Sequence, residues 1–234
     1  MTKQLLAISF LMFVHVLGFS LMVPVFPYIV EQFGGNAVVY GLLVSSYSMF
    51  QLLGAPLLGS LGDKYGRRPV LAICQAMTVL GWIIFAVSYF VPEIPVLGLS
   101  LPLLVIVVSR VIDGSTGGSI SVANAYISDM TQSHEKTKAF GILSVVGGLG
   151  FVAGPVLGAY TSSFDMGYLG TVYLALVISF LSLLFTLLYL PESLPASRRA
   201  TDVEISILAE INIFAKLMKF RQNRVVYKLF FIWM

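Results

Sequence analysis

Six long apolar segments recur along the chain, and short polar stretches separate them. Their approximate limits are 5–31, 38–60, 69–91, 99–127, 138–161 and 168–190. Roughly 20 helical residues cross the hydrocarbon core of a bilayer. Backbone polar groups in lipid must be satisfied within their own segment, so apolar runs of this length form helices. The pattern predicts an all-α membrane protein in which residues 1–191 form a six-transmembrane-helix bundle.

The polar connections alternate in charge. Three are rich in Lys and Arg: 62–68, 129–138 and 197–228. The three between them contain neither: 31–37, 92–98 and 162–167. Because Lys and Arg in short loops stay cytoplasmic, we expect the N-terminus and residues 192–228 in the cytoplasm, with the bundle in the plasma (inner) membrane. The first apolar run lacks a small-residue cleavage site, so we expect a spanning helix rather than a removed signal peptide.

The composition excludes several other classes of protein. Hydrophobic residues make up 58% of the chain and charged residues 11%, whereas soluble domains carry about 25% charged residues. The net charge of +3 comes from basic loop residues, which membrane topology explains without a nucleic-acid partner. Cys74 is the only cysteine, so the chain has no internal disulfide. With no nucleophile–base set, phosphate loop or metal-ligand spacing, we expect neither an enzyme nor a cofactor or metal.

The composition changes beyond Pro191. Residues 192–224 mix charged residues with apolar ones at helical spacing, such as Ile207 and Ile211. This pattern is typical of an amphipathic helix on the cytoplasmic membrane surface, although a solvated linker fits as well. A new apolar run, residues 225–234, is too short to span a bilayer. We expect it to be the start of a truncated seventh helix.

A few polar residues lie inside the apolar segments. Arg110 and Asp113 are three residues apart on one face of the fourth segment. Charges within a span are expensive unless they are paired or face water. The two residues form either a static pair or the charged lining of a polar cavity. His15, in the middle of the first segment, is either an interior hydrogen-bonded group or a group that titrates near neutral pH.

Other features inside the segments have structural explanations beside functional ones. Gln51 and Asn124 are weaker candidates for a polar pathway, because interhelical hydrogen bonds explain most such residues. Pro24 and Pro27 should bend the first span. The fifth segment carries glycines at every fourth position and a neighbouring proline: Gly150, Gly154, Gly158 and Pro155. This smooth stripe lets another backbone approach closely, for static packing or for motion.

The connection after the second segment reads Gly-Ser-Leu-Gly-Asp-Lys-Tyr-Gly-Arg-Arg-Pro from Gly59. Asp63 and Arg67 are four residues apart and can pair at the membrane surface. Asp129 ends the fourth segment on the same side, so it can join them. Such a network can hold helices together in one state and break in another. The alternative is a simple positive anchor.

These residues resemble signatures of the major facilitator superfamily. Its loop signature, G-x-L-x-D-R-x-G-R-R, matches Gly59, Leu61, Asp63, Gly66, Arg67 and Arg68, with Lys64 at the first basic position. Its fourth-helix signature, R-x-x-x-G, matches Arg110 and Gly114. Its antiporter signature, G-x-x-x-G-P-x-x-G-G, matches Gly150, Gly154, Pro155 and Gly158, with Ala159 in the last place. The pieces MVPVFPYI, ANAYISDMT, VAGPVLGAY and LPES look most like the tetracycline/proton and related multidrug antiporters.

The resemblance implies the N-terminal half of a twelve-helix fold that works by alternating access, with a substrate site near the midplane between two halves. In such proteins Asp63, Arg67 and Asp129 would close the cytoplasmic side. Arg110 would lie in the proton and substrate path. Gly154 and Pro155 would shape a helix at the interface of the halves.

The sequence departs from the tetracycline antiporters at two positions. His15 stands where they carry an acidic residue, nine positions before Pro24. Asp113 stands where relatives often have a neutral residue. We therefore hypothesise that His15, Arg110 and Asp113 form the titratable set.

The expected function is secondary transport, with proton-coupled export of a small amphipathic compound. Two alternatives remain open: a truncated or non-transporting membrane half that acts only with a second half, and a proton-coupled uptake carrier. The expected partners are the lipid bilayer, a small-molecule substrate, protons, and either a C-terminal half or a second copy of the chain.

Overall fold

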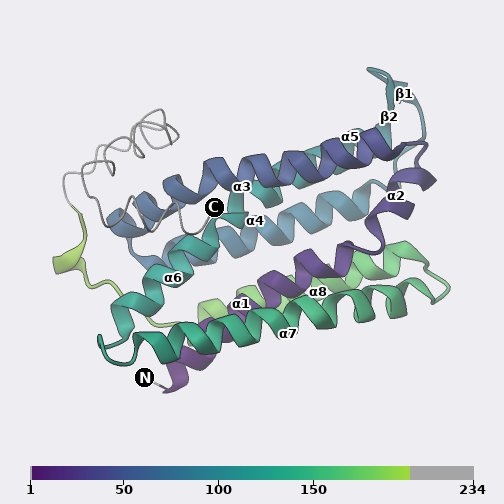
Figure 1. Ribbon diagram of the computed structural model, residues 1–234. Helices are drawn as coiled ribbons and strands as arrows, with labels where there is room; N and C mark the ends of the chain where they lie inside the picture. The colour runs from purple at the N-terminus through teal and green to yellow at the C-terminus, as the bar shows by residue number, and fades with distance from the viewer. Residues whose placement is uncertain (1, 201–234) are drawn as a thin grey trace, which may run out of the picture.

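The computed structural model of the protein describes residues 2–200 as a bundle of helices lying side by side (Figure 1). The α-helices are α1 (Thr2–Met22), α2 (Phe26–Gln32), α3 (Ala37–Tyr65), α4 (Arg67–Val87), α5 (Leu101–Gly117), α6 (Ser119–Met130), α7 (Lys136–Ser162) and α8 (Tyr168–Tyr189). A hairpin of β1 (Pro95–Val96) and β2 (Leu99–Ser100) joins α4 to α5, and a short 3-10 helix covers Ala196–Arg198. The predicted amphipathic helix beyond residue 200 and the predicted start of a seventh helix at 225–234 lie outside the described residues.

Within residues 2–200, six segments are long and apolar enough to cross a membrane, which confirms the six spans predicted for this part of the chain. The bundle has two ends (Figure 1). The end that holds the chain's N-terminus also holds the α3–α4 and α6–α7 connections, and we call it the N-terminal end. The other end holds α2, the α7–α8 connection and the β-hairpin, and we call it the hairpin end.

Two of the predicted spans are interrupted helices. The expected single helix over 5–31 was wrong, because α1 ends at Met22 and α2 begins at Phe26. Pro24 has no N–H to continue the helical ladder, and Pro27 suits the first turn of a new helix. The fourth span, Leu101–Met130, breaks at Gly118 into α5 and α6.

The break at Gly118 lets the fourth span lie close to α3. A β-carbon on Gly118 would collide with the backbone of Ala55 in α3. The Gly117 carbonyl at the break accepts a hydrogen bond from Gln51 Nε2 at 3.2 Å. Ser121 Oγ donates to the carbonyl oxygens of Gly118 and Ala55. Gln51 and Ser121 therefore satisfy backbone groups that lie at or beside an interruption within the membrane.

The predicted loop at 62–68 is far shorter in the structure. Helix α3 continues to Tyr65 and α4 starts at Arg67, so Gly66 alone connects them. Gly66 has φ +103°, a backbone conformation that side-chain-bearing residues rarely adopt. This one-residue turn brings the end of α3 directly beside the start of α4.

The outer faces of the helices differ in chemistry. Helix α8 buries its polar side chains, including Thr171, Ser179 and Thr186, and exposes large apolar ones, including Phe180 and Leu188. Helix α4 does the same, with Gln75 buried and an apolar outer face. The exposed faces of α3 and α7 also carry large apolar residues, such as Leu42 and Val152. Small exposed residues lie among them: Gly41, Ser45 and Ser48 on α3, and Gly141, Ser144 and Gly148 on α7. Large apolar faces suit lipid, whereas small residues suit another helix.

The glycine stripe of α7 faces α1. A β-carbon on Gly154 would lie 2.6 Å from Ser20 Cβ and 2.8 Å from the Leu21 nitrogen. A β-carbon on Gly150 would lie 2.9 Å from the Phe13 carbonyl oxygen. Ser20 Oγ donates to the Phe151 carbonyl at 2.6 Å and ties the two helices together. The predicted close approach is therefore present, and its partner is α1.

Replacing Gly154 with alanine should force α1 and α7 apart. We expect the free energy of unfolding in mixed micelles to fall by about 1–3 kcal/mol, the typical penalty for overpacking. Gly148→Ala is the matched control on the same helix, because nothing lies within 4 Å of its β-carbon position. That control should be neutral or slightly stabilising, since alanine favours a helix. Equal losses in both variants would contradict this account of the stripe.

Candidate functional site

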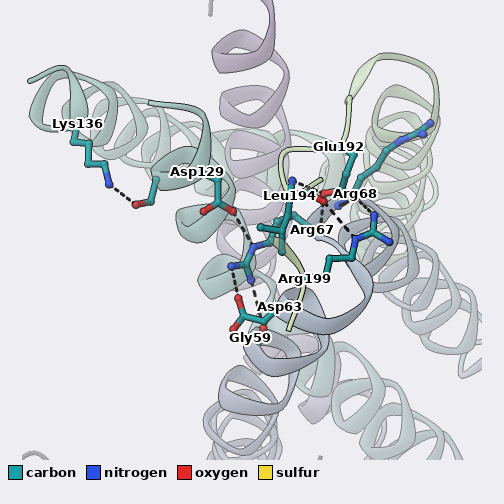
Figure 2. A network of polar contacts seen from close by, with 10 residues as sticks. Gly59, Asp63, Arg67, Arg68, Asp129, Lys136, Glu192, Leu194 and Arg199 are labelled. Atoms are coloured by element: carbon teal, nitrogen blue, oxygen red, sulfur yellow. Dashed lines mark hydrogen bonds and ion pairs between the residues drawn. The ribbon is translucent and has the colours of Figure 1, made fainter. Parts of the chain in front are cut away.

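An ion-pair network lies at the N-terminal end of the bundle (Figure 2). Arg67 begins α4 and is 7% exposed. Its Nη2 bonds Asp63 Oδ1 in the last turn of α3 at 2.5 Å, and its Nε bonds Asp129 Oδ2 near the end of α6 at 3.1 Å. Its Nη1 also donates to the Gly59 carbonyl at 3.4 Å. The structure thus brings together the three residues of the predicted gate.

One guanidinium joins three helices in this network. Asp63 and Asp129 are more exposed than Arg67, with side-chain exposures of 52% and 27%. The buried cation therefore depends on two carboxylates that water can reach. Because removing one partner of a shielded ion pair costs more than removing one partner of an exposed pair, loss of Asp129 should destabilise this end more than loss of Asp63.

Other residues of the loop signature support Arg67. A β-carbon on Gly62 would lie 2.9 Å from Arg67 Nη1, so glycine leaves room for the guanidinium. Leu61 packs against the apolar cluster around Leu71 and Tyr126. Arg68 Nη2 donates to the Leu187 carbonyl near the end of α8 at 2.7 Å. The signature thus joins α3, α4, α6 and α8 at one end.

Glu192 is a part of this site that the sequence did not reveal. Its carboxylate accepts hydrogen bonds from the backbone N–H of Arg67 at 2.9 Å and of Arg68 at 3.3 Å. These are among the free N–H groups of the first turn of α4, whose own N-cap, Gly66, has no side chain. Glu192 therefore caps α4 from the segment that follows α8. The sign of such a cap in the sequence is that α4 begins after a glycine, which has no side chain to cap the helix itself.

Replacing Glu192 with alanine should destabilise the N-terminal end of the bundle. Loss of a helix cap typically costs about 0.5–2 kcal/mol, and we expect that decrease in the free energy of unfolding in mixed micelles. Glu192→Gln keeps an acceptor oxygen, so its free energy of unfolding should fall by less than that of Glu192→Ala. Glu135 makes no side-chain bond to a helix start in the described chain, so Glu135→Ala serves as control. A cap role would be contradicted if Glu192→Ala left the stability unchanged.

A second polar site lies in the interior of the bundle. Arg110 and Asp113 of α5 are 5% and 9% exposed, and Arg110 Nη1 lies 3.4 Å from Asp113 Oδ2. The Arg110 guanidinium also lies over two aromatic rings of α4, 4.8 Å from the Trp82 centroid and 5.1 Å from that of Phe85. Cation–π contacts of this kind stabilise a desolvated cation. In the described part of the chain, Arg110 Nε has no hydrogen-bond partner.

The two charged residues line different cavities. Asp113 lines a narrow cavity of about 10 Å³ with His15 and Gln75, which is room for about one water molecule. Arg110 lines a neighbouring apolar cavity of about 40 Å³ with Phe19 and Phe26. Tyr47 borders both cavities. His15 of α1 and Asp113 of α5 thus share a cavity, and Arg110 is linked to them through its pair with Asp113. That the three act as one titratable set stays a prediction.

The remaining predicted pathway residues lie elsewhere. Gln51 bonds the Gly117 carbonyl and lines neither of these cavities. Asn124 lies exposed on α6 and is also absent from both linings. Their part in a substrate pathway stays a prediction. Within residues 2–200, no group of three or more His, Cys, Asp or Glu residues is placed to hold a metal ion.

Comparison with known proteins identifies the family. The family model described as Major Facilitator Superfamily matches residues 8–234. The chain belongs to the Major Facilitator Superfamily. This confirms the family that the loop, fourth-helix and fifth-helix signatures predicted.

Similar proteins include two that are named for drug resistance. Major facilitator superfamily domain-containing protein 10 of Bos taurus is 31% identical over 81% of this chain and 38% of its own length. Tetracycline resistance protein, class C, of Escherichia coli is 33% identical over 78% of this chain and 43% of its own. Quinolone resistance protein NorA of Staphylococcus aureus is 33% identical over 68% of this chain and 38% of its own. The chain thus spans about two-fifths of the length of these relatives.

A solved structure shows the same fold. The human organic anion transporter MFSD10 (TETRAN) matches with a TM-score of 0.68 and 24% identity, over 85% of this chain and 50% of that chain. The six spans correspond to one half of that major facilitator structure. Within residues 2–200 the chain thus has the fold of a six-span unit of the Major Facilitator Superfamily.

Proposed function

We propose that this major facilitator unit exports small amphipathic compounds in exchange for protons by alternating access. The buried Arg110–Asp113 pair carries the proposal. Maintaining two charges among apolar side chains is expensive, and such pairs in membrane proteins typically mark ion or substrate paths. The names of the tetracycline and quinolone resistance relatives favour drug-like substrates.

Asp113 is the group we expect to take up the proton. Its carboxylate pairs with Arg110 on one side and faces the narrow cavity with His15 on the other. Protonation would remove its negative charge and weaken the pair at 3.4 Å. The Arg110 guanidinium would then be held mainly by Trp82 and Phe85. Proton binding and a change in the charge of the interior are coupled in this way.

A second unit is needed to complete a substrate path, and α3 and α7 are the faces we expect it to cover. In each of these two spans only 17% of the residues of the most apolar stretch are buried, a smaller share than in the other four spans of the described chain. Their exposed small residues allow close contact with other helices. The second unit is either a C-terminal half or a second copy of this chain. The N-terminal end of the bundle, with its basic residues, faces the cytoplasm in this proposal.

Transport by reconstituted vesicles tests the function. The full chain in proteoliposomes with a pH gradient should move tetracycline, norfloxacin or ethidium against a concentration gradient, as followed by fluorescence. Movement with the proton gradient instead would support the uptake alternative. If transport appears only after a C-terminal major facilitator half is added, the result would support the alternative in which this chain is a membrane half that acts only with a second half. The export proposal is contradicted if none of these conditions gives pH-driven movement.

The titratable residues can be tested in the same vesicles. Asp113→Asn should abolish the dependence of transport on the pH gradient, because the amide cannot exchange a proton at this position. His15→Ala should shift the pH at which transport is half-maximal while leaving some coupling. Unchanged pH profiles in both variants would contradict the assignment of the titratable set. Gln75→Leu, a variant of a neutral group lining the same cavity, controls for changes in cavity shape.

A further inference from the structure

The β-hairpin between α4 and α5 has an unusual tip. Its strands pair Val96 with Leu99, and the two residues between them, Leu97 and Gly98, have φ of +52° and +82°. Two-residue turns with positive φ at both positions favour Asn and Gly, because a larger side chain is strained there. Leu97 occupies such a position and is 92% exposed, more than any other large apolar side chain described. Neither local backbone preference nor contact within the bundle explains a leucine at this tip.

The hairpin is held firmly to the bundle. The Leu101 N–H donates to the Ile94 carbonyl at 2.9 Å, so the two sides of the hairpin are joined beyond the strands. Ser100 Oγ donates to the Phe33 carbonyl that follows α2, at 2.7 Å. These bonds fix the position of the hairpin relative to α2 and α5. The exposure of Leu97 is therefore a feature of a fixed projection.

The apolar tip continues the outer face of α4. One stripe of exposed apolar side chains follows this helix: Ile73, Met77, Leu80, Ile83 and Val87. Beyond the helix, Phe90 at 69% exposure, Ile94 at 49% and Leu97 at 92% are also large apolar side chains that the bundle leaves uncovered. On the inner side of α4, Gln75 and Trp82 are buried. A span that buries its polar groups and exposes apolar ones faces lipid, so the chain enters the hairpin directly from a lipid-facing helix.

We propose that the hairpin tip inserts into the bilayer leaflet at the hairpin end and anchors α4 and α5 there. The partner is the acyl-chain and glycerol region of phospholipids. Leu97, Ile94 and Phe90 supply the apolar contact, and Glu93 is the only charged residue between 88 and 100. Binding at the boundary between headgroups and acyl chains grows with the apolar area that is buried there, and these three side chains supply that area. The inference does not depend on which compound the protein transports.

Spin labelling in bilayers tests the insertion. Cys74 is the only cysteine and is buried, so Cys74→Ala provides a cysteine-free chain. Nitroxide labels are then placed at Leu97→Cys, Glu93→Cys, Ile83→Cys as the lipid reference, and Asp165→Cys in the α7–α8 connection as the water reference. The full chain is reconstituted in phosphatidylcholine nanodiscs. Collision rates with oxygen and with a water-soluble nickel complex report lipid and water exposure.

We expect the oxygen-to-nickel ratio at position 97 to approach that at 83 and to exceed that at 165 at least fivefold. Position 93 should resemble 165. A nickel-dominated signal at 97 equal to that at 165 would overturn the proposal. If Cys74→Ala does not fold, labelling in the native background serves equally, because the buried thiol is shielded from reagent. Leu97→Asn, which fits the turn better, should remain folded yet release a label at Ile94→Cys toward water.

Discussion

Replacing Arg110 with methionine should both destabilise the protein and stop transport. The substitution leaves the Asp113 carboxylate buried without its cation and removes the contacts with Trp82 and Phe85. Breaking a buried pair on one side typically costs about 3–5 kcal/mol. The free energy of unfolding in mixed micelles should fall by roughly that amount. Arg198→Met, an exposed site without a side-chain contact in the described chain, is the matched control and should change stability by about 0.5 kcal/mol or less.

The double variant Arg110→Met/Asp113→Asn separates stability from function. It removes both charges and keeps much of the side-chain volume, so most of the lost stability should return. Transport should not return, because the proposed proton acceptor and its cation are both gone. The two single losses should together exceed the loss in the double variant by at least about 2 kcal/mol, toward the upper end of the roughly 0.5–3 kcal/mol that is typical for groups in contact.

Two outcomes would contradict the role given to this pair. If the double variant transports with normal dependence on pH, the charges serve only the packing of α4 against α5. If the two single variants add without an interaction energy, Arg110 and Asp113 do not act together. Thermal unfolding, transport rate and its pH profile, measured on the same preparations, distinguish these cases.

The spans could be predicted from the sequence because few backbone structures can cross lipid with all their polar groups hydrogen-bonded. Backbone groups in a bilayer need helices, so apolar runs and basic loops indicate the number of spans directly. The interruptions were harder. Pro24 signalled a bend but not a complete end of α1 at Met22, and Gly118 looks like any other helical glycine in the sequence. At this break Gly118 lies against the backbone of Ala55 in α3, a tertiary contact that the sequence does not show.

The candidate site, too, could be predicted from the sequence only in part. Asp63 and Arg67 could be paired from their spacing, and Asp129 from the side of the membrane on which its span ends. Glu192 could not, because its role requires the end of α8 to return to the start of α4. Likewise, the sequence does not show whether a polar residue in a span faces the interior or the outside of the bundle. Asn124 is exposed, whereas His15 lines the cavity with Asp113. Helical phase alone did not separate these cases.

Replacing Arg67 with glutamine should loosen the N-terminal end of the bundle. The guanidinium bonds two carboxylates and a carbonyl on neighbouring helices, and glutamine can neither reach nor neutralise both acids. Hydrogen bonds to charged groups contribute about 1.5–3 kcal/mol. Since each 1.4 kcal/mol is a tenfold change in an equilibrium, the closed arrangement should lose population by roughly 10- to 100-fold. Arg67→Lys should lose less of the closed arrangement than Arg67→Gln but more than the unchanged protein, because an ammonium bridges fewer oxygens than a guanidinium does.

Spin labels at Tyr65→Cys, on the last residue of α3, and at Gln132→Cys, in the α6–α7 connection, measure this loosening by pulsed electron resonance. The distance distribution should broaden and lengthen in Arg67→Gln. Lys136→Gln is the control, because Lys136 belongs to the same end but its ammonium bonds Ser128 rather than the acidic pair. An unchanged distribution with normal transport would show that the network does not act as a gate. An unchanged distribution with lost transport would show that Arg67 supports transport without holding this end closed, which would contradict the loosening predicted here.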